Sequence, residues 1–479
     1  MYLHFVSVAD TMPPMLFNSH AFLFFFLPLA LGGYYALPAR WHSAWLVAAS
    51  YFFYGWWNWR YCGLLLLVTS IDYLSGARVA AAPSPRAARR WLVFSVAADL
   101  AILGFFKYYD LGATTANGLL RLFGCTSSPV PVLHLLLPVG ISFYVFQSMS
   151  YSIDIYRGQA RPARSFLDFA AYVSLFPQLV AGPIVRYRDM DAQLRSRTHT
   201  SAKAAAGITL FVLGLAKKVL LADGVAPLAD AAFAAPAPTF AAAWSGLLAY
   251  TLQIYFDFSG YSDMAVGLGL LLGFRFPINF DSPYKSLSIT DFWRRWHISL
   301  SSWLRDYLYI PLGGNRRSPA RTYFNLWLTM LLGGLWHGAA WTFFCWGAWH
   351  GLWLALERAH GKKPWFSRFP RPAQIFCTFV LVMLGWVFFR SPDFASAGRY
   401  FLGLAGVHGL GPLPATTETP LLPWLVLLVA FAIAFFAPNS WQLSKRPTLP
   451  FAFTMGLLFV ICISVLLANA SSPFLYFQF

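Results

Sequence analysis

Long apolar runs, separated by short polar segments, make up most of the chain. A helix of about 17–25 residues is long enough to cross the hydrocarbon core of a bilayer. The pattern therefore predicts an all-α integral-membrane protein that crosses the membrane many times. We expect spanning helices over residues 17–37, 44–57, 62–74, 91–106, 133–155, 204–221, 241–256, 323–335, 341–356, 375–389, 421–436 and 451–467.

The basic residues between these runs predict the orientation. Most of the 35 Lys and Arg residues fall in segments that would share one face of the membrane, as cytoplasmic loops do. The largest clusters are 83–90, 157–164, 186–203, 294–321 and 358–371. We therefore expect these clusters in the cytoplasm, with both termini and the segments 107–131, 222–240 and 390–420 outside.

Two apolar stretches do not fit a simple alternation between the two sides. Residues 166–185 have arginines at both ends and contain Pro177, Gly182 and Pro183, and residues 266–278 begin and end on the basic side. We expect both stretches to be re-entrant. Because broken backbone at membrane depth must be buried or line a cavity, such segments suit a channel, a transporter or an enzyme with a buried tunnel.

The N-terminal region is expected to remain in the membrane. The apolar run 22–37 has no basic region before it and no small-residue cleavage site, so we interpret it as an uncleaved first span. Met15 opens a more natural N-terminus than Met1, and we expect residues 1–14 to be a start-site artefact. Since apolar runs recur along the whole length, we expect residues 1–479 to form a single membrane-embedded domain.

Residues 279–322 are the least membrane-like part of the second half. Thr290 can cap a helix that starts at Asp291, and apolar residues then recur at helical spacing up to Tyr307, among charged residues. This segment is expected to be an amphipathic helix at the cytoplasmic interface. Its basic, Trp-rich face suits an anionic donor molecule or acidic lipid.

Composition supports the membrane interpretation and excludes other classes. Hydrophobic residues make up 58% of the chain and charged residues 11%, against about 25% charged residues in soluble domains. The net charge of +17 is spread over several clusters, so we expect no nucleic-acid partner. The five cysteines are scattered without a CxxC motif, which indicates neither a disulfide framework nor a zinc site.

Three histidines lie in otherwise apolar surroundings. His337 lies in a glycine-rich hairpin between two spans, His350 follows thirteen residues later, and His297 lies on the apolar face of the amphipathic segment. An ionisable side chain at bilayer depth marks a functional site by default. Imidazole is the usual general base for a hydroxyl proton, although a hydrogen-bonded core histidine is the alternative for each. No Cys or carboxylate lies at ligand spacing, so no metal is expected.

Asp257 and Asp263 are the acids of most interest, because they enter the second expected re-entrant segment. They are placed to orient a histidine or to line a polar tunnel. Pairing with nearby arginines at the membrane edge is an interpretation at least as good.

Eight stretches resemble the membrane-bound O-acyltransferase family and, within it, the bacterial alginate O-acetyltransferase branch. They are SYFFYGW (50–56), PVGISF (138–143), PQLVAGPI (177–184), DFSGYSD (257–263), FWRRWH (292–297), GLWHG (334–338), PNS (438–440) and FLYFQF (474–479). Together they cover nearly the whole chain from Met15 and are specific, although each alone is weak. The resemblance implies a helical bundle with re-entrant segments and a central tunnel.

The resemblance also implies roles for individual residues. His337 matches the family's catalytic histidine, and His297 matches a second polar position that is Asn or His depending on the branch. We expect a supporting or tunnel-lining role for His350 and for four further residues, Asp257, Asp263, Trp336 and Trp296.

The implied reaction is acetyl transfer at the bacterial inner membrane. A cytoplasmic thioester such as acetyl-coenzyme A would be the donor, with no bound cofactor, and an exported polysaccharide, alginate first, the acceptor. A periplasmic acetyltransferase partner is expected to deliver the group to sugar hydroxyls. The alternatives are D-alanyl transfer to teichoic acid, O-acetylation of peptidoglycan or cellulose, and, from another class, a transporter.

Overall fold

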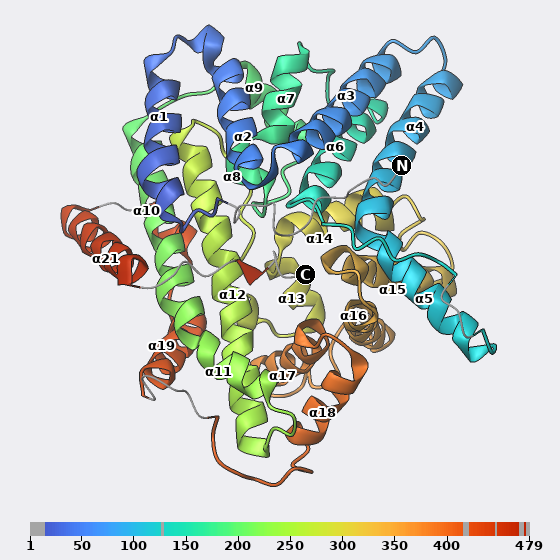
Figure 1. Cartoon of the computed structure of the whole chain (residues 1–479), viewed down its shortest axis with the longest axis vertical. Coiled ribbons are helices and arrows are strands. Elements are labelled where there is room, and N and C mark those ends of the chain that lie inside the picture. The colour runs from blue at the N-terminus through green and yellow to red at the C-terminus, as the bar shows by residue number, and fades with distance from the viewer. Residues whose placement is uncertain (1–14, 126–128, 415–420, 446–447, 469–473, 476–479) are drawn as a thin grey trace. The chain divides into compact units, whose positions relative to one another are not determined.

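The computed structural model describes residues 15–125, 129–414, 421–445, 448–468 and 474–475. Within these ranges every regular element is helical and no strand is present (Figure 1). The all-α prediction is confirmed. Residues 1–14, which we expected to be a start-site artefact, lie outside the described residues. The last four residues of the 474–479 stretch also lie outside them.

Five helical segments are long and apolar enough to cross a membrane, judged by length and composition in the described residues. They are Arg60–Ala80, Pro85–Leu122, Ser201–Ala234, Arg371–Arg390 and Leu449–Ala468. Shorter apolar helices cover Ala21–Ala36 and Leu422–Phe436. These helices support a multi-pass membrane protein.

The chain folds into two compact units. Unit 1 comprises Met1–Lys203 and Gly269–Phe276, and unit 2 comprises Ala204–Leu268 and Pro277–Phe479. The principal helices of unit 1 are α1 (Leu27–Ala36), α2 (His42–Asn58), α3 (Arg60–Ala80), α4 (Pro85–Leu103), α5 (Tyr109–Leu122), α6 (Ile141–Tyr156), α7 (Phe166–Ser174), α8 (Phe176–Leu179) and α9 (Tyr187–Arg195).

The irregular segment predicted over residues 166–185 is present in unit 1. The backbone breaks between α7 and α8, and the amide of Phe176 at this break donates to the Ser50 hydroxyl. The Tyr172 hydroxyl donates to the carbonyl of Val185, 2.8 Å away. Broken backbone is therefore buried and satisfied by side chains from neighbouring helices, as a low-dielectric interior requires.

The helices of unit 2 carry the histidines of interest. They are α10 (Ser201–Ala216), which begins in unit 1, α11 (Asp223–Ala234), α12 (Phe240–Leu271), α13 (Ile289–Arg295), α14 (Ile298–Leu304), α15 (Pro319–His337), α16 (Trp341–Ala359), α17 (Arg371–Arg390), α18 (Phe394–Leu404), α19 (Leu422–Phe436), α20 (Ser440–Leu443) and α21 (Leu449–Ala468). A π-helical turn, η5 (Lys217–Ala222), joins α10 to α11, and another, η7 (Arg305–Tyr309), follows α14.

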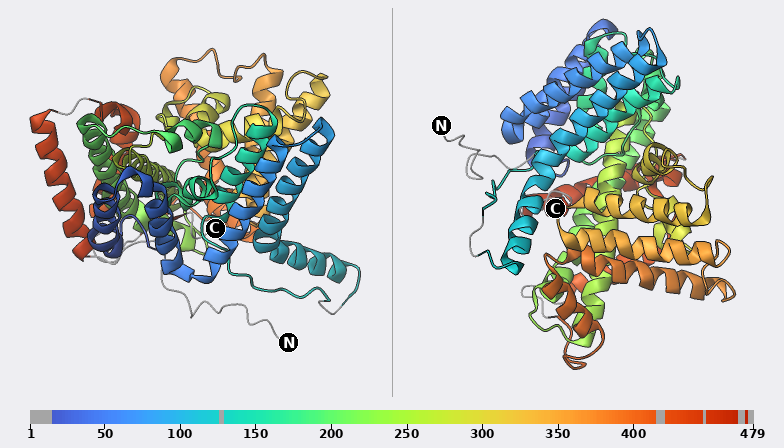
Figure 2. Two further views of the ribbon diagram at one scale, coloured as in Figure 1. Left: turned by 90° about the horizontal axis from the view of Figure 1, so that it is seen from above. Right: turned by 90° about the vertical axis from the view of Figure 1, so that its right-hand side faces the viewer.

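Helices α15, α16 and α17 pack side by side, as the yellow-to-orange helices of Figure 2 show. A Cβ atom at Gly334 would overlap the carbonyl oxygen of Phe343, and one at Gly347 would overlap that of Met330. The glycines near His337 therefore allow two helix backbones to approach each other closely.

The prediction of a second re-entrant segment is wrong. Residues 241–271 form one continuous helix, α12, which ends just before Gly273 with its φ of 85°. Gly260 and Gly267 lie against the backbone of α10 at Gly214 and Gly207. Close helix packing, rather than a return of the chain, explains these small residues.

Several predicted boundaries also differ from the structure. The expected outer segments 107–131 and 222–240 contain helices α5 and α11. The helix expected from residue 133 begins only at Ile141, because Pro138 and Gly140, with φ 74°, interrupt it. α11 contains Pro227 in its interior, a residue that usually kinks or ends a helix.

The amphipathic helix expected over 291–307 is two short helices. α13 begins at Ile289, and its cap is Ser288, whose hydroxyl accepts from the amide of Asp291, so the cap predicted at Thr290 is wrong. The helix ends before His297, where the amide of Ile298 donates to the carbonyl of Asn279. A tertiary hydrogen bond thus replaces the intrahelical one at this break.

Candidate active site

His337 is the last residue of α15. Its side chain is buried, with 3% of its surface exposed. The ring centroids of Trp346 and Phe389 lie 5.0 and 5.4 Å from that of the imidazole. The carbonyl end of a helix stabilises positive charge nearby, which a base acquires when it accepts a proton.

His297 lies between α13 and α14 in left-handed backbone, with φ 44°. The side chain is fully buried, and its Nδ1 atom lies 3.2 Å from Oδ1 of Asn279. Because an amide oxygen only accepts hydrogen bonds, Nδ1 carries the proton and the lone pair is on Nε2. Burial lowers the pKa of His297 to about 3, so the ring is neutral near pH 7.

The structure brings His297 and His337 together. Their ring centroids are 6.1 Å apart. The indole of Trp336 contacts both rings, at 5.7 Å from His297 and 4.9 Å from His337. Phe258 of α12 closes the other side of His297, with its ring 4.7 Å away. Three of the predicted site residues therefore form one cluster among aromatic rings.

His350 lies on α16, one aromatic residue away from this cluster. Trp346 contacts both His337 and His350, with 4.9 Å between the centroids of Trp346 and His350. The imidazole stacks on Phe292 at 5.9 Å and 8°. Neither ring nitrogen has a hydrogen-bond partner in the part of the chain that the structure describes. His350 thus resembles a packed aromatic ring more than a proton carrier.

Trp296 supports the break between α13 and α14. It is almost fully buried, and its ring lies 5.1 Å from Trp386 of α17 and 5.0 Å from Phe280. Trp386 in turn stacks on Trp346, which contacts His337. Trp296 is therefore linked to His337 through the rings of Trp386 and Trp346.

Asp257 and Asp263 pair with lysines of the π-helical turn η5. Lys218 Nζ lies 2.7 Å from Asp257 Oδ1, and Lys217 Nζ lies 2.7 Å from Asp263 Oδ2. The backbone amide of Leu475 donates to the other oxygen of Asp257. Of the two interpretations of these acids, the structure supports ion pairing, but the predicted arginine partners are wrong, because the basic residues within reach are the lysines of η5.

A basic pocket of about 570 Å³ opens beside α13, α15 and α16. Four cationic side chains line it, together with Asp291 and Thr290: Arg294, Arg295, Arg358 and Lys362. Arg295 is held by Asp291, with 2.9 Å between Nε and Oδ1. The excess of positive charge makes this pocket suitable for a multiply charged anion.

Two residues that position the site were not expected from the sequence. The carboxylate of Glu357 on α16 accepts from the amides of Ile289 and Thr290 and from the Thr290 hydroxyl, at 2.6–3.0 Å. Asn279 accepts from His297 and from the amide and hydroxyl of Ser299. The sequence contains a sign of the role of Glu357, which is a single acid at the end of an apolar run. It contains no comparable sign for Asn279.

A second buried polar cluster, in unit 1, was also missed. Asp72 on α3 accepts hydrogen bonds from the hydroxyls of Ser95 on α4 and Ser148 on α6. Asp99 on α4 lies within hydrogen-bonding reach of Asp72, and neither of its oxygens has a donor in the described structure. Both carboxyls are fully buried. The signal was a lone acid inside each of two predicted spans.

The described residues contain no group of three or more His, Cys, Asp or Glu side chains placed to hold a metal ion.

Comparison with known proteins agrees with these motifs. Residues 160–388 match the profile of the membrane-bound O-acyltransferase family. The chain is 47% identical to the probable alginate O-acetylase AlgI of Azotobacter vinelandii and 48% identical to that of Pseudomonas putida, covering 97% of this chain and 100% of each relative. It is 37% identical to the peptidoglycan O-acetyltransferase of Helicobacter pylori, over 97% of this chain and 98% of the relative.

The match extends over both units and includes the helices that carry His297 and His337. The all-helical architecture and the apolar helices agree with it. The chain is a multi-pass membrane enzyme and belongs to the membrane-bound O-acyltransferase family.

Proposed function

We propose that this enzyme moves an acetyl group from a cytoplasmic thioester across the bacterial inner membrane, for O-acetylation of an exported polysaccharide. The observation that carries the proposal is the pairing of His337 with His297 inside a buried aromatic cluster. Alginate is the acceptor that we favour, because the relatives that match over almost the whole chain are named as probable alginate O-acetylases.

In this proposal His337 is the general base. Its imidazole takes the proton from the acceptor hydroxyl while the oxygen attacks the thioester carbonyl. The C–S bond breaks, an ester C–O bond forms, and the proton passes to the leaving thiolate. Aromatic walls at Trp336, Trp346 and Phe389 keep water away from the thioester, which limits hydrolysis.

His297 has a positioning role in the same scheme. Asn279 fixes its tautomer, so that the lone pair is on Nε2. A neutral ring with a fixed acceptor nitrogen can hold the acceptor hydroxyl in place or share the proton with His337. The left-handed backbone and the hydrogen bond together leave the ring little freedom to turn.

We assign the donor's phosphates to the basic pocket beside α13. Arg294 and Arg358 line it with two further cations, and coenzyme A carries several phosphate charges. Glu357 joins this pocket to the site, because it holds the start of α13 and so the helix that leads to His297. The basic residues of this pocket predict that it faces the cytoplasm, where loops rich in Lys and Arg are usually found.

The acetyl group is then expected to pass to a periplasmic acetyltransferase. The longest expected outer segment, 390–420, contains the helix α18 and no recognisable carbohydrate-binding arrangement in its described part. A polymer is poorly suited to reach a histidine that is 3% exposed. A relay protein resolves this difficulty.

The test is reconstitution of the full-length protein in liposomes, with acetyl-coenzyme A inside and alginate outside. Acetylation of alginate should require both this protein and a periplasmic extract of the parent bacterium. Efficient acetylation without the extract would show that the relay is unnecessary. Failure to consume acetyl-coenzyme A under either condition would contradict the donor assignment.

The acceptor has a second candidate, peptidoglycan, because a relative that matches over 97% of the chain is named as a peptidoglycan O-acetyltransferase. Offering alginate and peptidoglycan fragments in the same liposome assay distinguishes the two. Transfer of D-alanine from its carrier thioester, and not of acetate, would instead favour the teichoic acid alternative.

A further inference from the structure

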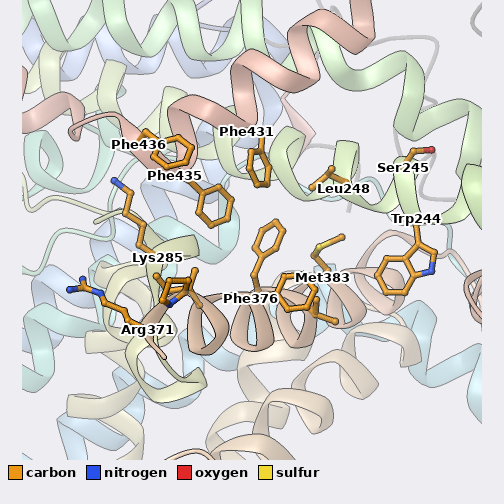
Figure 3. Close-up of a pocket in the computed structure, with 14 residues that line it drawn as sticks. Trp244, Ser245, Leu248, Lys285, Arg371, Phe376, Met383, Phe431, Phe435 and Phe436 are labelled. Carbon is orange, nitrogen blue, oxygen red and sulfur yellow. The ribbon is translucent and has the colours of Figure 1, made fainter. Parts of the chain in front are cut away.

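A long apolar groove lies on unit 2 between α12, α17 and α19. Its volume is about 1050 Å³, and fourteen residues line it. Figure 3 shows the rings of Phe376, Phe431 and Phe435 along its middle and Trp244 at one end. Pockets for small ligands typically measure about 300–1,000 Å³, so this groove is large enough for an extended apolar chain.

Among the described residues, the two cations that line the groove are together at its other end. Figure 3 shows Lys285 and Arg371 beside each other there, away from Trp244. The part of the chain that the structure describes contributes no acidic residue to the lining of the groove. The groove therefore matches a molecule with a long apolar part and a single anionic group at one end.

The surroundings of both cations favour an anion. Arg371 is the first residue of the 20-residue helix α17, where the positive end of the helix dipole disfavours a cation unless an anion is near. Lys285 Nζ donates to the carbonyl of Ala437 at 3.0 Å, which fixes it at the groove mouth. A lysine ammonium has three hydrogens, so two remain for a ligand.

We propose that this groove binds an anionic phospholipid of the inner leaflet, with its phosphate at Lys285 and Arg371 and its acyl chains along the phenylalanines. Basic pockets between membrane helices on the cytoplasmic side bind such headgroups. The basic residues around Arg371 place this end in the cytoplasm by the charge rule. The pocket beside α13, with four cations, is the better match for a polyphosphate donor, whereas two cations suit one phosphate.

The test measures lipid binding to the full-length protein in mild detergent by native mass spectrometry. Phosphatidylglycerol is compared with phosphatidylethanolamine of the same acyl chains. We expect the wild type to prefer phosphatidylglycerol, and Arg371→Gln to lower its affinity about five-fold, the ratio that corresponds to about 1 kcal/mol for one basic residue at an anionic surface. Arg368→Gln is the matched control, since Arg368 is exposed, lies three residues earlier and does not line the groove.

Four outcomes would overturn the proposal. They are equal binding of the two lipids, an equal loss in Arg368→Gln, displacement of phosphatidylglycerol by acetyl-coenzyme A, and equally tight binding of inorganic phosphate. Displacement by acetyl-coenzyme A would make the groove a donor site, and phosphate binding would mean that the chains contribute nothing. A second variant, Val380→Trp, fills the groove without changing charge and should weaken binding of phosphatidylglycerol while Arg371 is intact.

Discussion

The two units each bury ionisable side chains, but in different chemical surroundings. In unit 1, Asp72 receives hydrogen bonds from serine hydroxyls on two neighbouring helices, with Asp99 beside it. In unit 2, His337 and His297 are surrounded by Trp and Phe rings. The carboxyl cluster uses short side chains as partners, whereas the histidine cluster uses large apolar ones.

From this difference we expect the carboxyl cluster to stabilise the fold and the histidine cluster to carry the reaction. A buried carboxylate that is satisfied by hydroxyls from α4 and α6 ties three helices together and needs no ligand. Imidazoles behind aromatic walls have a water-poor environment and a fixed geometry, as catalysis requires. A buried ionisable residue in a membrane protein is thus not by itself a catalytic residue, and its neighbours decide which role it has.

The largest expected effect tests the histidine cluster. His337→Ala should lower acetyl transfer by about 10²–10⁴-fold, because the general base is lost. Abundance of the protein in the membrane should stay near that of the wild type. Transfer at the wild-type rate, at equal abundance, would remove His337 from the mechanism.

The carboxyl cluster should respond in stability instead. Asp72→Ala leaves the hydroxyl of Ser148 without its acceptor, whereas the hydroxyl of Ser95 can still donate to Ser152. An orphaned buried group costs about 1–3 kcal/mol. We expect a clear loss of thermal stability, measured by intrinsic fluorescence in detergent. Activity per folded molecule should be unchanged, and its loss would break the comparison between the two clusters.

The partner of Asp72 sharpens this test. Two adjacent buried carboxylates cannot both be ionised cheaply, so we expect Asp99 to be protonated and to donate to Asp72. Asp99→Asn replaces that acid by an amide donor of the same shape and should leave stability nearly unchanged. A loss as large as that of Asp72→Ala would show that Asp99 is the ionised partner.

The backbone at His297 predicts an order among its substitutions. Left-handed backbone costs most side chains about 1–2 kcal/mol, and Asn tolerates it better than Ala. Asn can also donate to Asn279 in place of the imidazole. We therefore expect His297→Asn to keep more stability and more acetyl transfer than His297→Ala, in thermal and activity measurements on the same preparations. The reverse order would contradict the positioning role.

The pH dependence of stability offers a smaller test of the same residue. His297 has a folded pKa of about 3, below its usual value in an unfolded chain of about 6.5. The unfolded state therefore binds the proton first, and the contribution of His297 to stability is complete above pH 6.5 and is lost as pH falls toward 3. His297→Asn should show a weaker loss between these pH values than the wild type. Identical slopes would mean that His297 is not buried in its neutral form.

The smallest expected effect concerns His350. The ring of His350 stacks on Phe292 and meets Trp346 edge to face, and its nitrogens have no partners in the described structure. His350→Phe should therefore preserve both stability and acetyl transfer. Acetyl transfer is measured in the liposome assay. A large drop in transfer without unfolding would give His350 the supporting role that the sequence suggested.

The sequence by itself determined the class of the protein and predicted a catalytic histidine. Apolar runs of spanning length force the backbone into helices, since no other partner for its polar groups exists in lipid. The GLWHG motif and the isolation of His337 among apolar residues predict a functional role for that histidine without knowledge of its neighbours.

Only the tertiary structure decided what surrounds each of these residues. Helical periodicity predicts one amphipathic helix over 291–307, but the hydrogen bond from Ile298 to Asn279 breaks it and turns His297 toward His337. Asp257 and Asp263 pair with lysines about forty residues earlier in the chain. Glu357 accepts a hydrogen bond from Thr290, 67 residues away in the sequence, and Asn279 contacts His297, 18 residues away. Such contacts depend on how helices pack, and local sequence patterns reach only a few residues along the chain.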